Sequence, residues 1–293
     1  YRDKEYKLRQ IPSGLVYEKC RLLIGPGVLV NPDVLLDEIR KYNVDKSRIG
    51  VDERAGVIGT QHIDRERGSH HLKEKIGSTL SGCGEGNVDR VRRILGLARD
   101  SEKLKEFITD VPLELWNAID RKETIIIEGT QGTFLSLYHG TYPFVTSKDV
   151  SASSACADVG VGPKYVDEVI VVFKSYVTRV GAGPLPGELP PEEIKKRGWV
   201  EYGTVTGRLR RAAPFNFELA YRAVRLNSAT QIALTKLDVM FPEVAHATEW
   251  DELSSEAKRF VEKIERKLGV PVTIIRTGRD IRDTIDRREE LCR

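Results

Sequence analysis

The stretch TIIIEGTQGTFLSLYHGTYPFVTS, residues 124–147, decides whether this α/β protein has a phosphate loop or a different ligand-binding turn after its strand. Its β-branched beginning predicts a strand over 124–128, and the EGTQG that follows predicts a turn. Open α/β sheets bind ligands outside the carboxyl ends of their strands, so this turn is a candidate ligand site. A phosphate loop of the Gly-x-x-x-x-Gly-Lys-Ser/Thr type is excluded, because no lysine follows the glycines. The polar groups present instead are the amide of Gln131 and the hydroxyls of a second turn at 140–147.

The composition is typical of a globular protein of ordinary charge. The 293 residues are 40% hydrophobic and 31% charged, with a formal net charge of +3. This small charge gives no sign of a nucleic-acid-binding protein, and no apolar run approaches membrane-spanning length. The four cysteines (Cys20, Cys83, Cys156 and Cys292) are scattered without a Cys-x-x-Cys pair. This pattern favours free thiols in a reducing compartment, so we expect a cytoplasmic protein.

Strand and helix patterns alternate along the chain. Short runs rich in Val, Ile or Leu predict strands at 21–24, 28–30, 124–128, 168–174, 231–235 and 271–276. Apolar stripes and capping residues predict helices at 32–41, 87–98, 101–119, 215–227 and 255–268. This alternation predicts an α/β fold with a largely parallel central sheet flanked by helices. No shift in composition marks a boundary, so we expect residues 1–293 to form a single domain.

A glycine-rich stretch, IGSTLSGCGEG at 76–86, precedes the predicted helix at 87–98. Small residues let a backbone approach a ligand closely, and a following helix N-terminus favours an anion. Its spacing is not that of a dinucleotide-binding loop, and no strand is predicted before it. The stretch is therefore either an anion-binding loop or an ordinary turn.

Two further polar stretches follow the predicted strand at 168–174. VTRVGAGPLPGELP (177–190) is punctuated by glycine and proline, which predicts a shaped loop at the ligand edge of the sheet. YGTVTGRLRR (202–211) places arginines beside hydroxyl groups, a combination that binds carboxylate or phosphate. The alternatives for this second stretch are a solvated basic turn and a nucleic-acid patch.

The stretch ALTKLDVM, residues 233–240, runs from a predicted strand into Lys236 and Asp238. A carboxylate only accepts hydrogen bonds, so it can take two from the adjacent N–H groups of guanine but not from adenine. The lysine stem can lie against the face of the base while its charge stays in water. An ordinary surface ion pair is the alternative.

Together, these stretches resemble the adenylosuccinate synthetase family, which joins aspartate to inosine monophosphate (IMP) at the expense of GTP. The resemblance covers essentially the whole chain, in the family's order, through LRQIPSG (8–14), EGTQG and GTYPFVTS (128–147), TRVGAGP (178–184), GTVTGRLRR (203–211), TKLD (235–238) and TG (277–278). The small divergent loops are most similar to the short, archaeal-type members. The resemblance implies the P-loop-NTPase-like fold of that family, GTP as co-substrate, one Mg²⁺ per subunit and a homodimer.

The resemblance also implies an IMP-binding set: Thr79, Arg93, Gln131, Thr146, Val180 and Arg208. Gln131 matches a glutamine that contacts the base, and its amide would support charge developing on the O6/N1 edge during catalysis. Thr79 and Thr146 match threonines that bind the phosphate. Arg93 matches an arginine that reaches across the dimer.

Two more sets follow from the same resemblance. The aspartate-binding set is Thr204, Val205, Thr206, Arg208 and Arg210, and the GTP-binding set is Arg210, Lys236, Asp238, Thr277 and Gly278. At 80–81 this chain has Leu-Ser where many members have Gly-Arg, which puts one usual contact to aspartate in doubt.

The implied reaction has two steps. O6 of IMP attacks the γ-phosphate of GTP, and the aspartate amine then displaces the phosphate from carbon six. The family's general base (Asp) and general acid (His) belong to an N-terminal segment that also contacts the metal, and neither has a match here. The sequence begins at Tyr1, just after that place, and we expect the segment to belong to the natural protein. Gln131 is the one catalytic candidate in this chain, and no metal ligand is assigned in it.

A missing Asp–His segment leaves two alternatives open. One is a GTP-binding module that reads guanine through Lys236 and Asp238 without IMP chemistry. The other is a catalytically incomplete homologue.

Overall fold

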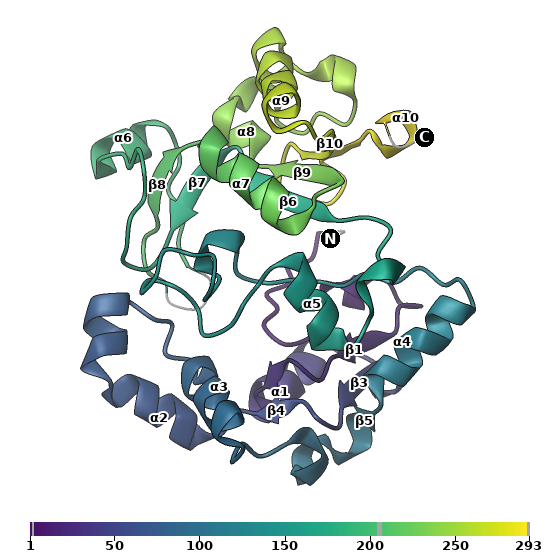
Figure 1. Ribbon diagram of the computed structural model, residues 1–293. Helices are drawn as coiled ribbons and strands as arrows, with labels where there is room; N and C mark the ends of the chain where they lie inside the picture. The colour runs from purple at the N-terminus through teal and green to yellow at the C-terminus, as the bar shows by residue number, and fades with distance from the viewer. Residues whose placement is uncertain (2, 204–206, 292–293) are drawn as a thin grey trace. The chain divides into compact units, whose positions relative to one another are not determined.

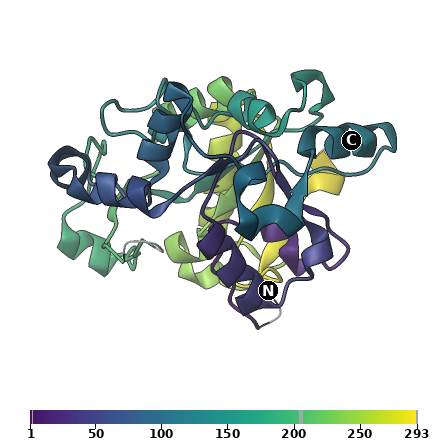
Figure 2. The same ribbon diagram turned by 90° about the horizontal axis from the view of Figure 1, so that it is seen from below.

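The structure is a computed structural model that describes residue 1, residues 3–203 and residues 207–291 (Figure 1). It divides into two compact units: unit 1 comprises Tyr1–Tyr6 and Asp167–Arg293, and unit 2 comprises Lys7–Val166. The change from one unit to the other along the chain can be followed by colour in Figure 2. No helix of the described residues combines the length and the apolar character needed to cross a membrane. Whether the chain forms a single domain stays a prediction.

Unit 2 contains five α-helices and five short strands among its described residues. The helices are α1 (Pro32–Tyr42), α2 (Thr60–Gly68), α3 (Cys83–Arg92), α4 (Val111–Asp120) and α5 (Ala152–Val159). The strands are β1 (Leu22–Ile24), β2 (Leu29–Val30), β3 (Ile49–Asp52), β4 (Gly56–Val57) and β5 (Ile108–Thr109). A π-helix, η3 (His71–Ile76), follows α2, and 3₁₀ helices include η5 (Glu102–Phe107) and η6 (Thr133–Leu135).

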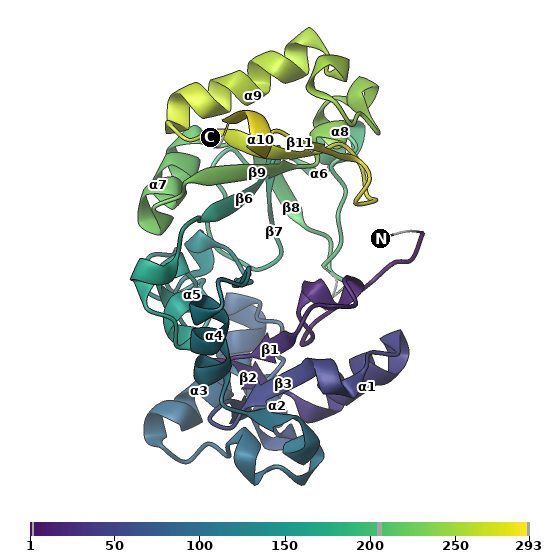
Figure 3. The ribbon, with the colours of Figure 1, turned by 90° about the vertical axis from the view of Figure 1, so that its right-hand side faces the viewer.

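The strands of unit 2 form two small parallel sheets. One has the order β1-β3-β5, with Leu22 opposite Ile49, and the other pairs β2 with β4. Helix α4 buries Val111 and Leu115 in a cluster with Val161. Helices α2 and α3 lie side by side (Figures 1 and 3).

Unit 1 contains the larger sheet. Its strands are β6 (Ile170–Lys174), β7 (Tyr176–Arg179), β8 (Arg211–Pro214), β9 (Gln231–Thr235), β10 (Val272–Arg276) and β11 (Thr284–Asp286). Its helices are α6 (Pro191–Lys196), α7 (Phe217–Asn227), α8 (Leu237–Met240), α9 (Ser255–Leu268) and α10 (Arg288–Leu291). The four-stranded sheet has the order β11-β10-β9-β6, in which β6, β9 and β10 are parallel and β11 is antiparallel. Strands β7 and β8 form a separate antiparallel pair.

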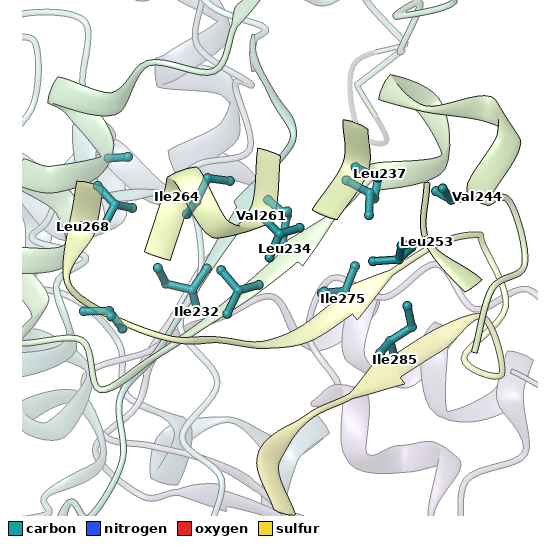
Figure 4. Packing of buried hydrophobic residues seen from close by; sticks show 14 of the residues in the cluster. Ile232, Leu234, Leu237, Val244, Leu253, Val261, Ile264, Leu268, Ile275 and Ile285 are labelled. Carbon is teal, nitrogen blue, oxygen red and sulfur yellow. The ribbon is translucent and has the colours of Figure 1, made fainter. Parts of the chain in front are cut away.

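The core of unit 1 lies between this sheet and its covering helices. Helix α9 presents Val261 and Ile264, both fully buried, towards Ile232 and Leu234 of β9 (Figure 4). Helix α7 contributes to the same cluster through its alanine and valine side chains. The stripe of apolar residues expected in the helix at 255–268 therefore packs as the sequence predicted. The α/β class with largely parallel strands is confirmed, and these strands are divided among four sheets.

Three element predictions were wrong in part. Residues 124–128 are extended but pair with no strand of the described chain: Ile125 and Ile127 pack on the α4 cluster, while Ile126 is 87% exposed. An alternating apolar pattern is therefore not enough to form a β-strand, because a strand also needs a neighbouring strand for its backbone hydrogen bonds.

The predicted helix at 101–119 is two helices. The carboxylate of Asp110 accepts a hydrogen bond from the Leu113 N–H (3.1 Å) and starts α4, with Pro112 in its first turn. The short strand β5 separates α4 from η5. The predicted helix at 87–98 begins four residues earlier, at Cys83, and ends at Arg92.

Candidate functional site

In unit 2, the loop after the extended segment folds back on itself. The Leu135 N–H donates to the Gly132 carbonyl (2.8 Å), and the Thr146 N–H donates to the Leu135 carbonyl (2.7 Å). Gln131 is exposed and has a positive φ of 70°, a conformation that is uncommon for a residue other than glycine. Gln131 and Thr146 thus belong to one closed loop with the Gln131 side chain turned to solvent.

A single carboxylate organises the end of this loop. Asp149 accepts hydrogen bonds from the hydroxyls of Ser136 (2.6 Å) and Ser151 (2.5 Å) and from the Val150 N–H (2.9 Å). Burial opposes ionisation of Asp149, but these hydrogen bonds outweigh it and hold its pKa below the ordinary value. The ionised carboxylate of Asp149 therefore holds the end of the loop in its conformation.

The glycine-rich stretch is held in the same manner by Glu66 of α2. This buried carboxylate accepts the backbone N–H groups of Gly82 (2.7 Å) and Gly84 (2.6 Å) at the start of α3. At the start of α3 the chain's own Glu66 therefore occupies the position in which a helix N-terminus favours an anion. Whether the stretch also binds an external anion stays a prediction. The polar groups left outward are the hydroxyls of Thr79 and Ser81, which lie 3.2 Å apart.

A side-chain hydrogen bond joins α3, the helix that follows the glycine-rich loop, to the loop that carries Thr146. The amide Nδ2 of Asn87, on α3, donates to the hydroxyl of Ser147 (2.7 Å), the residue after Thr146. The segments that carry Thr79, Gln131 and Thr146 are therefore linked within unit 2. These are the three residues expected to contact the base and phosphate of IMP.

The LRQIPSG segment joins the same assembly. The buried carboxylate of Glu38 accepts three consecutive N–H groups, from Arg9 (2.6 Å), Gln10 (3.0 Å) and Ile11 (3.0 Å). Further along, Ser13 donates its N–H and its hydroxyl to Glu128, each at 2.9 Å. This bond ties LRQIPSG to the start of EGTQG.

Arg93 ends α3 on the surface. It has a positive φ of 64°, and its N–H bonds to the Arg90 carbonyl. Its neighbours Val88, Val91 and Ile94 are 40%, 77% and 67% exposed, respectively. Arg93 therefore lies beside an exposed apolar surface.

In unit 1, two arginines shape the loop that follows Val180. Arg179 Nε donates to the Ala182 carbonyl (2.8 Å), and Arg211 Nη1 donates to the Gly183 carbonyl (2.9 Å). Val180 itself is half-buried at the start of this loop. The shaped loop expected from its glycines and prolines is thus fixed by guanidinium groups.

The predicted aspartate-binding residues are only partly placed. Thr204, Val205 and Thr206 lie outside the described residues. Arg208 is exposed and Arg210 is half-buried. Arg210 Nε lies 3.8 Å from the carboxylate of Glu201 and has no hydrogen-bond partner among the described residues.

Glu201 is the centre of a polar cluster. It accepts hydrogen bonds from Lys174 Nζ (2.9 Å) and from the Tyr176 hydroxyl (2.6 Å). Burial opposes its ionisation, but these bonds outweigh it and hold the pKa of Glu201 below its ordinary value. Burial also raises the pKa of Tyr176 and lowers that of Lys174. Glu201 therefore stays anionic beside Arg210.

The predicted GTP-binding residues follow two neighbouring strands. Lys236 comes directly after β9 with a φ of +66°, Asp238 lies in the first turn of α8, and Thr277 and Gly278 come directly after β10. Because β9 and β10 are parallel and Leu234 is opposite Ile275, their carboxyl ends lie level at one edge. The structure therefore places Lys236, Asp238, Thr277 and Gly278 at one edge of the sheet, as strand order alone requires. The fifth residue of the predicted set, Arg210, instead directly precedes β8.

The Thr277–Gly278 turn is braced on both sides. The Thr277 hydroxyl donates to the Ala247 carbonyl (2.6 Å), and the His246 N–H donates to the Thr277 carbonyl (2.9 Å). A Cβ added at Gly278 would lie 2.3 Å from Asp283 Oδ2, so any larger residue there would displace the Asp283 side chain. His246 Nδ1 lies 2.9 Å from Asp283 Oδ1, and this hydrogen bond, with the charges of Asp283 and Asp238, raises the pKa of His246.

The sequence patterns do not identify several supporting residues: Glu38, Glu66, Asn87, Asp149 and Glu201. Glu38, Asn87 and Glu201 act through contacts far away in the chain, which no local pattern reveals. Asp149 acts on Ser136 and Ser151, which are nearer in the chain. A weak sign exists for Glu66 alone, because it and His62 are spaced one helical turn apart in a helix with little apolar surface.

Comparison with known proteins places these features in a family. A family model described as adenylosuccinate synthetase matches residues 1–100 and 96–245. The chain is 57% identical to an adenylosuccinate synthetase of Methanocaldococcus jannaschii over 291 residues, which are 98% of this chain and 84% of that protein. It is 51% identical to one of Archaeoglobus fulgidus over 288 residues, which are 98% of this chain and 85% of that protein.

Two solved structures share the fold. A fully ligated adenylosuccinate synthetase from Plasmodium falciparum matches with a TM-score of 0.89 at 24% identity, over 97% of this chain and 89% of that one. A succinoaminodeoxyadenylate synthetase from cyanophage S-2L, bound to dGMP and to dATP as an energy donor, matches with a TM-score of 0.76 at 25% identity. That second match covers 95% of this chain and 80% of the phage protein.

Proposed function

The chain belongs to the adenylosuccinate synthetase family, whose members are ligases, and from this premise we propose that it joins L-aspartate to IMP at the expense of GTP. The products are adenylosuccinate, GDP and phosphate. The observation that carries the proposal is the linked loop assembly of unit 2, in which Asn87 and Ser147 join the segments of Thr79 and Thr146. Two hydroxyls on braced loops suit a small anion such as the nucleotide phosphate.

In the first step, O6 of IMP attacks the γ-phosphate of GTP. Gln131 contacts the O6/N1 edge, where an uncharged amide can both donate and accept. A donor fixed before the reaction stabilises the charge that develops there without reorganising. The exposed Gln131 side chain on its closed loop supports this role.

In the second step, the aspartate amine displaces the phosphate from carbon six. The residues Thr204 to Thr206, with Arg208 and Arg210, bind the aspartate carboxylates. A guanidinium group suits a carboxylate because it offers parallel N–H donors. Arg210 Nε lies 3.8 Å from anionic Glu201 and donates no hydrogen bond to the described residues, which supports a guanidinium oriented before substrate arrives.

The energy donor is a guanine nucleotide. Asp238 accepts two hydrogen bonds from the base, Lys236 lies against the base face, and Thr277 and Gly278 border it. Adenine lacks the two adjacent donors that an acceptor-only carboxylate needs. This distinguishes the proposal from the nucleotide named for the phage protein, dATP.

Magnesium accompanies GTP in the proposal. Within residues 1, 3–203 and 207–291, no group of three or more His, Cys, Asp or Glu side chains is placed to hold a metal ion. The described part of the chain thus offers no dedicated cage. Mg²⁺ in phosphoryl transfer is typically held by substrate phosphates and one or two carboxylates. When bound, it would neutralise charge on the phosphates.

The active form is a homodimer in which Arg93 reaches the phosphate of the partner subunit's IMP. The exposed apolar side chains of Val88, Val91 and Ile94 beside it support an interface, because monomeric surfaces rarely group such residues. In the same proposal the enzyme is cytoplasmic. The thiols of Cys20, Cys83 and Cys156, which form no disulfide, support this localisation.

A substrate-omission assay tests the proposal. GDP release is followed with Mg²⁺, GTP, IMP and aspartate, leaving out each in turn. Turnover that needs all three substrates is expected. GTP hydrolysis that is independent of IMP and aspartate would contradict the proposal and favour a GTP-binding module.

A further inference from the structure

The two loops expected to bind the nucleotide phosphate rest on different supports. The Thr79 loop is fixed to α2 and α3 through Glu66, whereas the Thr146 loop is closed by its own backbone and by Asp149. The bond from Asn87 Nδ2 to the Ser147 hydroxyl (2.7 Å) joins α3, the helix that follows the Thr79 loop, to the Thr146 loop. It crosses sixty residues of sequence and ends next to Thr146.

We infer that Asn87 is a positioning residue for IMP, which sets the spacing between the Thr79 and Thr146 hydroxyls. The inference rests on the proposed function. A phosphate is small, so its donors must stay within a fraction of an ångström of their best positions, about 0.5 Å. A bond from the helix that follows the Thr79 loop to a residue of the Thr146 loop limits the relative movement of these two segments.

Helix preference does not explain an asparagine at this place. Asparagine is a poorer helix former than alanine, and Asn87 lies in the second turn of α3, away from its cap. Replacing it with alanine should therefore favour the helix. If Asn87 only stabilised the fold, Asn87→Ala would instead make the protein less stable.

The test compares Asn87→Ala with the unmodified protein. The KM for IMP is expected to rise about tenfold, as for loss of one hydrogen bond that orders a site. The KM values for GTP and aspartate and the thermal midpoint are expected to stay unchanged. Asn117→Ala, at an exposed asparagine of α4, is the matched control and should change none of these quantities.

A double-mutant cycle sharpens the test. Ser147→Ala should raise the KM for IMP as Asn87→Ala does, and the double variant should be no worse than either single one. Ser147→Thr, which keeps the hydroxyl, should retain the original KM. An unchanged KM for IMP, additive effects in the double variant, or a lowered thermal midpoint would each overturn the inference. An unmodified protein that does not turn over IMP at all would instead contradict the proposed function.

Discussion

Unit 1 presents its candidate nucleotide groups at the ends of two adjacent strands, whereas unit 2 presents Thr79 and Thr146 on loops. In unit 1, the parallel register of β9 and β10 brings the residues after them together, and a buried hydrophobic cluster stabilises both strands. In unit 2, the same task is performed by buried or half-buried polar side chains, above all Glu66, Asn87 and Asp149. A site of the first kind depends on many weak contacts, and one of the second kind on a few strong ones.

The strongest test of this contrast removes one carboxylate. In Glu66→Gln, the N–H groups of Gly82 and Gly84 lose a charged acceptor in a buried place. The free energy of unfolding is expected to fall by about 3 kcal/mol, because hydrogen bonds to charged groups and unsatisfied buried donors each count for 1–3 kcal/mol. Urea denaturation measures this fall, and the KM for IMP should rise while that for GTP does not.

Glu74→Gln, at an exposed glutamate of η3, is the control and should change stability by less than about 0.5 kcal/mol. If Glu66→Gln behaved like this control, the loops of unit 2 would not depend on the carboxylate, and the contrast between the units would fail.

A second change addresses unit 1. Asp238→Asn replaces one of two acceptor oxygens with a donor, so guanine loses a hydrogen bond to a charged partner. The preference for GTP over xanthosine triphosphate is expected to fall by about thirtyfold, equivalent to about 2 kcal/mol. Competition kinetics measure the ratio, and Asp251→Asn, whose side chain is 97% exposed, serves as the control. Undiminished preference for GTP would remove Asp238 from the base site.

The third and smallest effect concerns His246 and pH. The hydrogen bond to Asp283 raises the pKa of His246 above its ordinary 6.5 and lowers that of Asp283 below its ordinary 3.8. The stabilisation of the pair is therefore full between pH 3.8 and 6.5. It is lost as the pH rises through the raised pKa of His246, and again as the pH falls through the lowered pKa of Asp283.

His246→Asn isolates this effect, because asparagine tolerates the positive φ of 67° found there. The stability difference between the two proteins, followed by urea denaturation from pH 5 to pH 9, should shrink as the pH rises. The charges near His246 include those of Asp238 and Asp283, and both are retained in the variant. A difference that grows with pH would show that the pair does not stabilise the fold.

The same contrast explains how far the sequence alone could lead. The strand that leads into ALTKLDVM was predicted correctly at 231–235, because a strand that is buried in a sheet is rich in apolar residues. The segment at 124–128 has a similar pattern and is not a strand, because pairing depends on a neighbour that the segment itself does not encode. The break before α4 was missed because Asp110 and Pro112 were read as part of one longer helix.

The residues of the candidate site show the same difference between what local patterns predict and what they do not. Gln131, Thr79, Thr146, Lys236 and Asp238 are predicted from the resemblance to family motifs, and their contacts to a ligand stay predictions. The roles of Glu66 and Asn87 were not identified, since each acts on backbone or side chains of another segment. The resemblance predicts which residues contact the substrate, and the structure shows which side chains hold the segments that carry them.

The three N–H groups of Arg9, Gln10 and Ile11 on the single carboxylate of Glu38 carry a consequence for how this protein can vary between species. Surface loops normally accept insertions and deletions. A segment whose three successive backbone groups converge on two oxygen atoms cannot gain or lose a residue without releasing all three. In this segment, side chains can be substituted during evolution, whereas insertion or deletion of a residue is not tolerated.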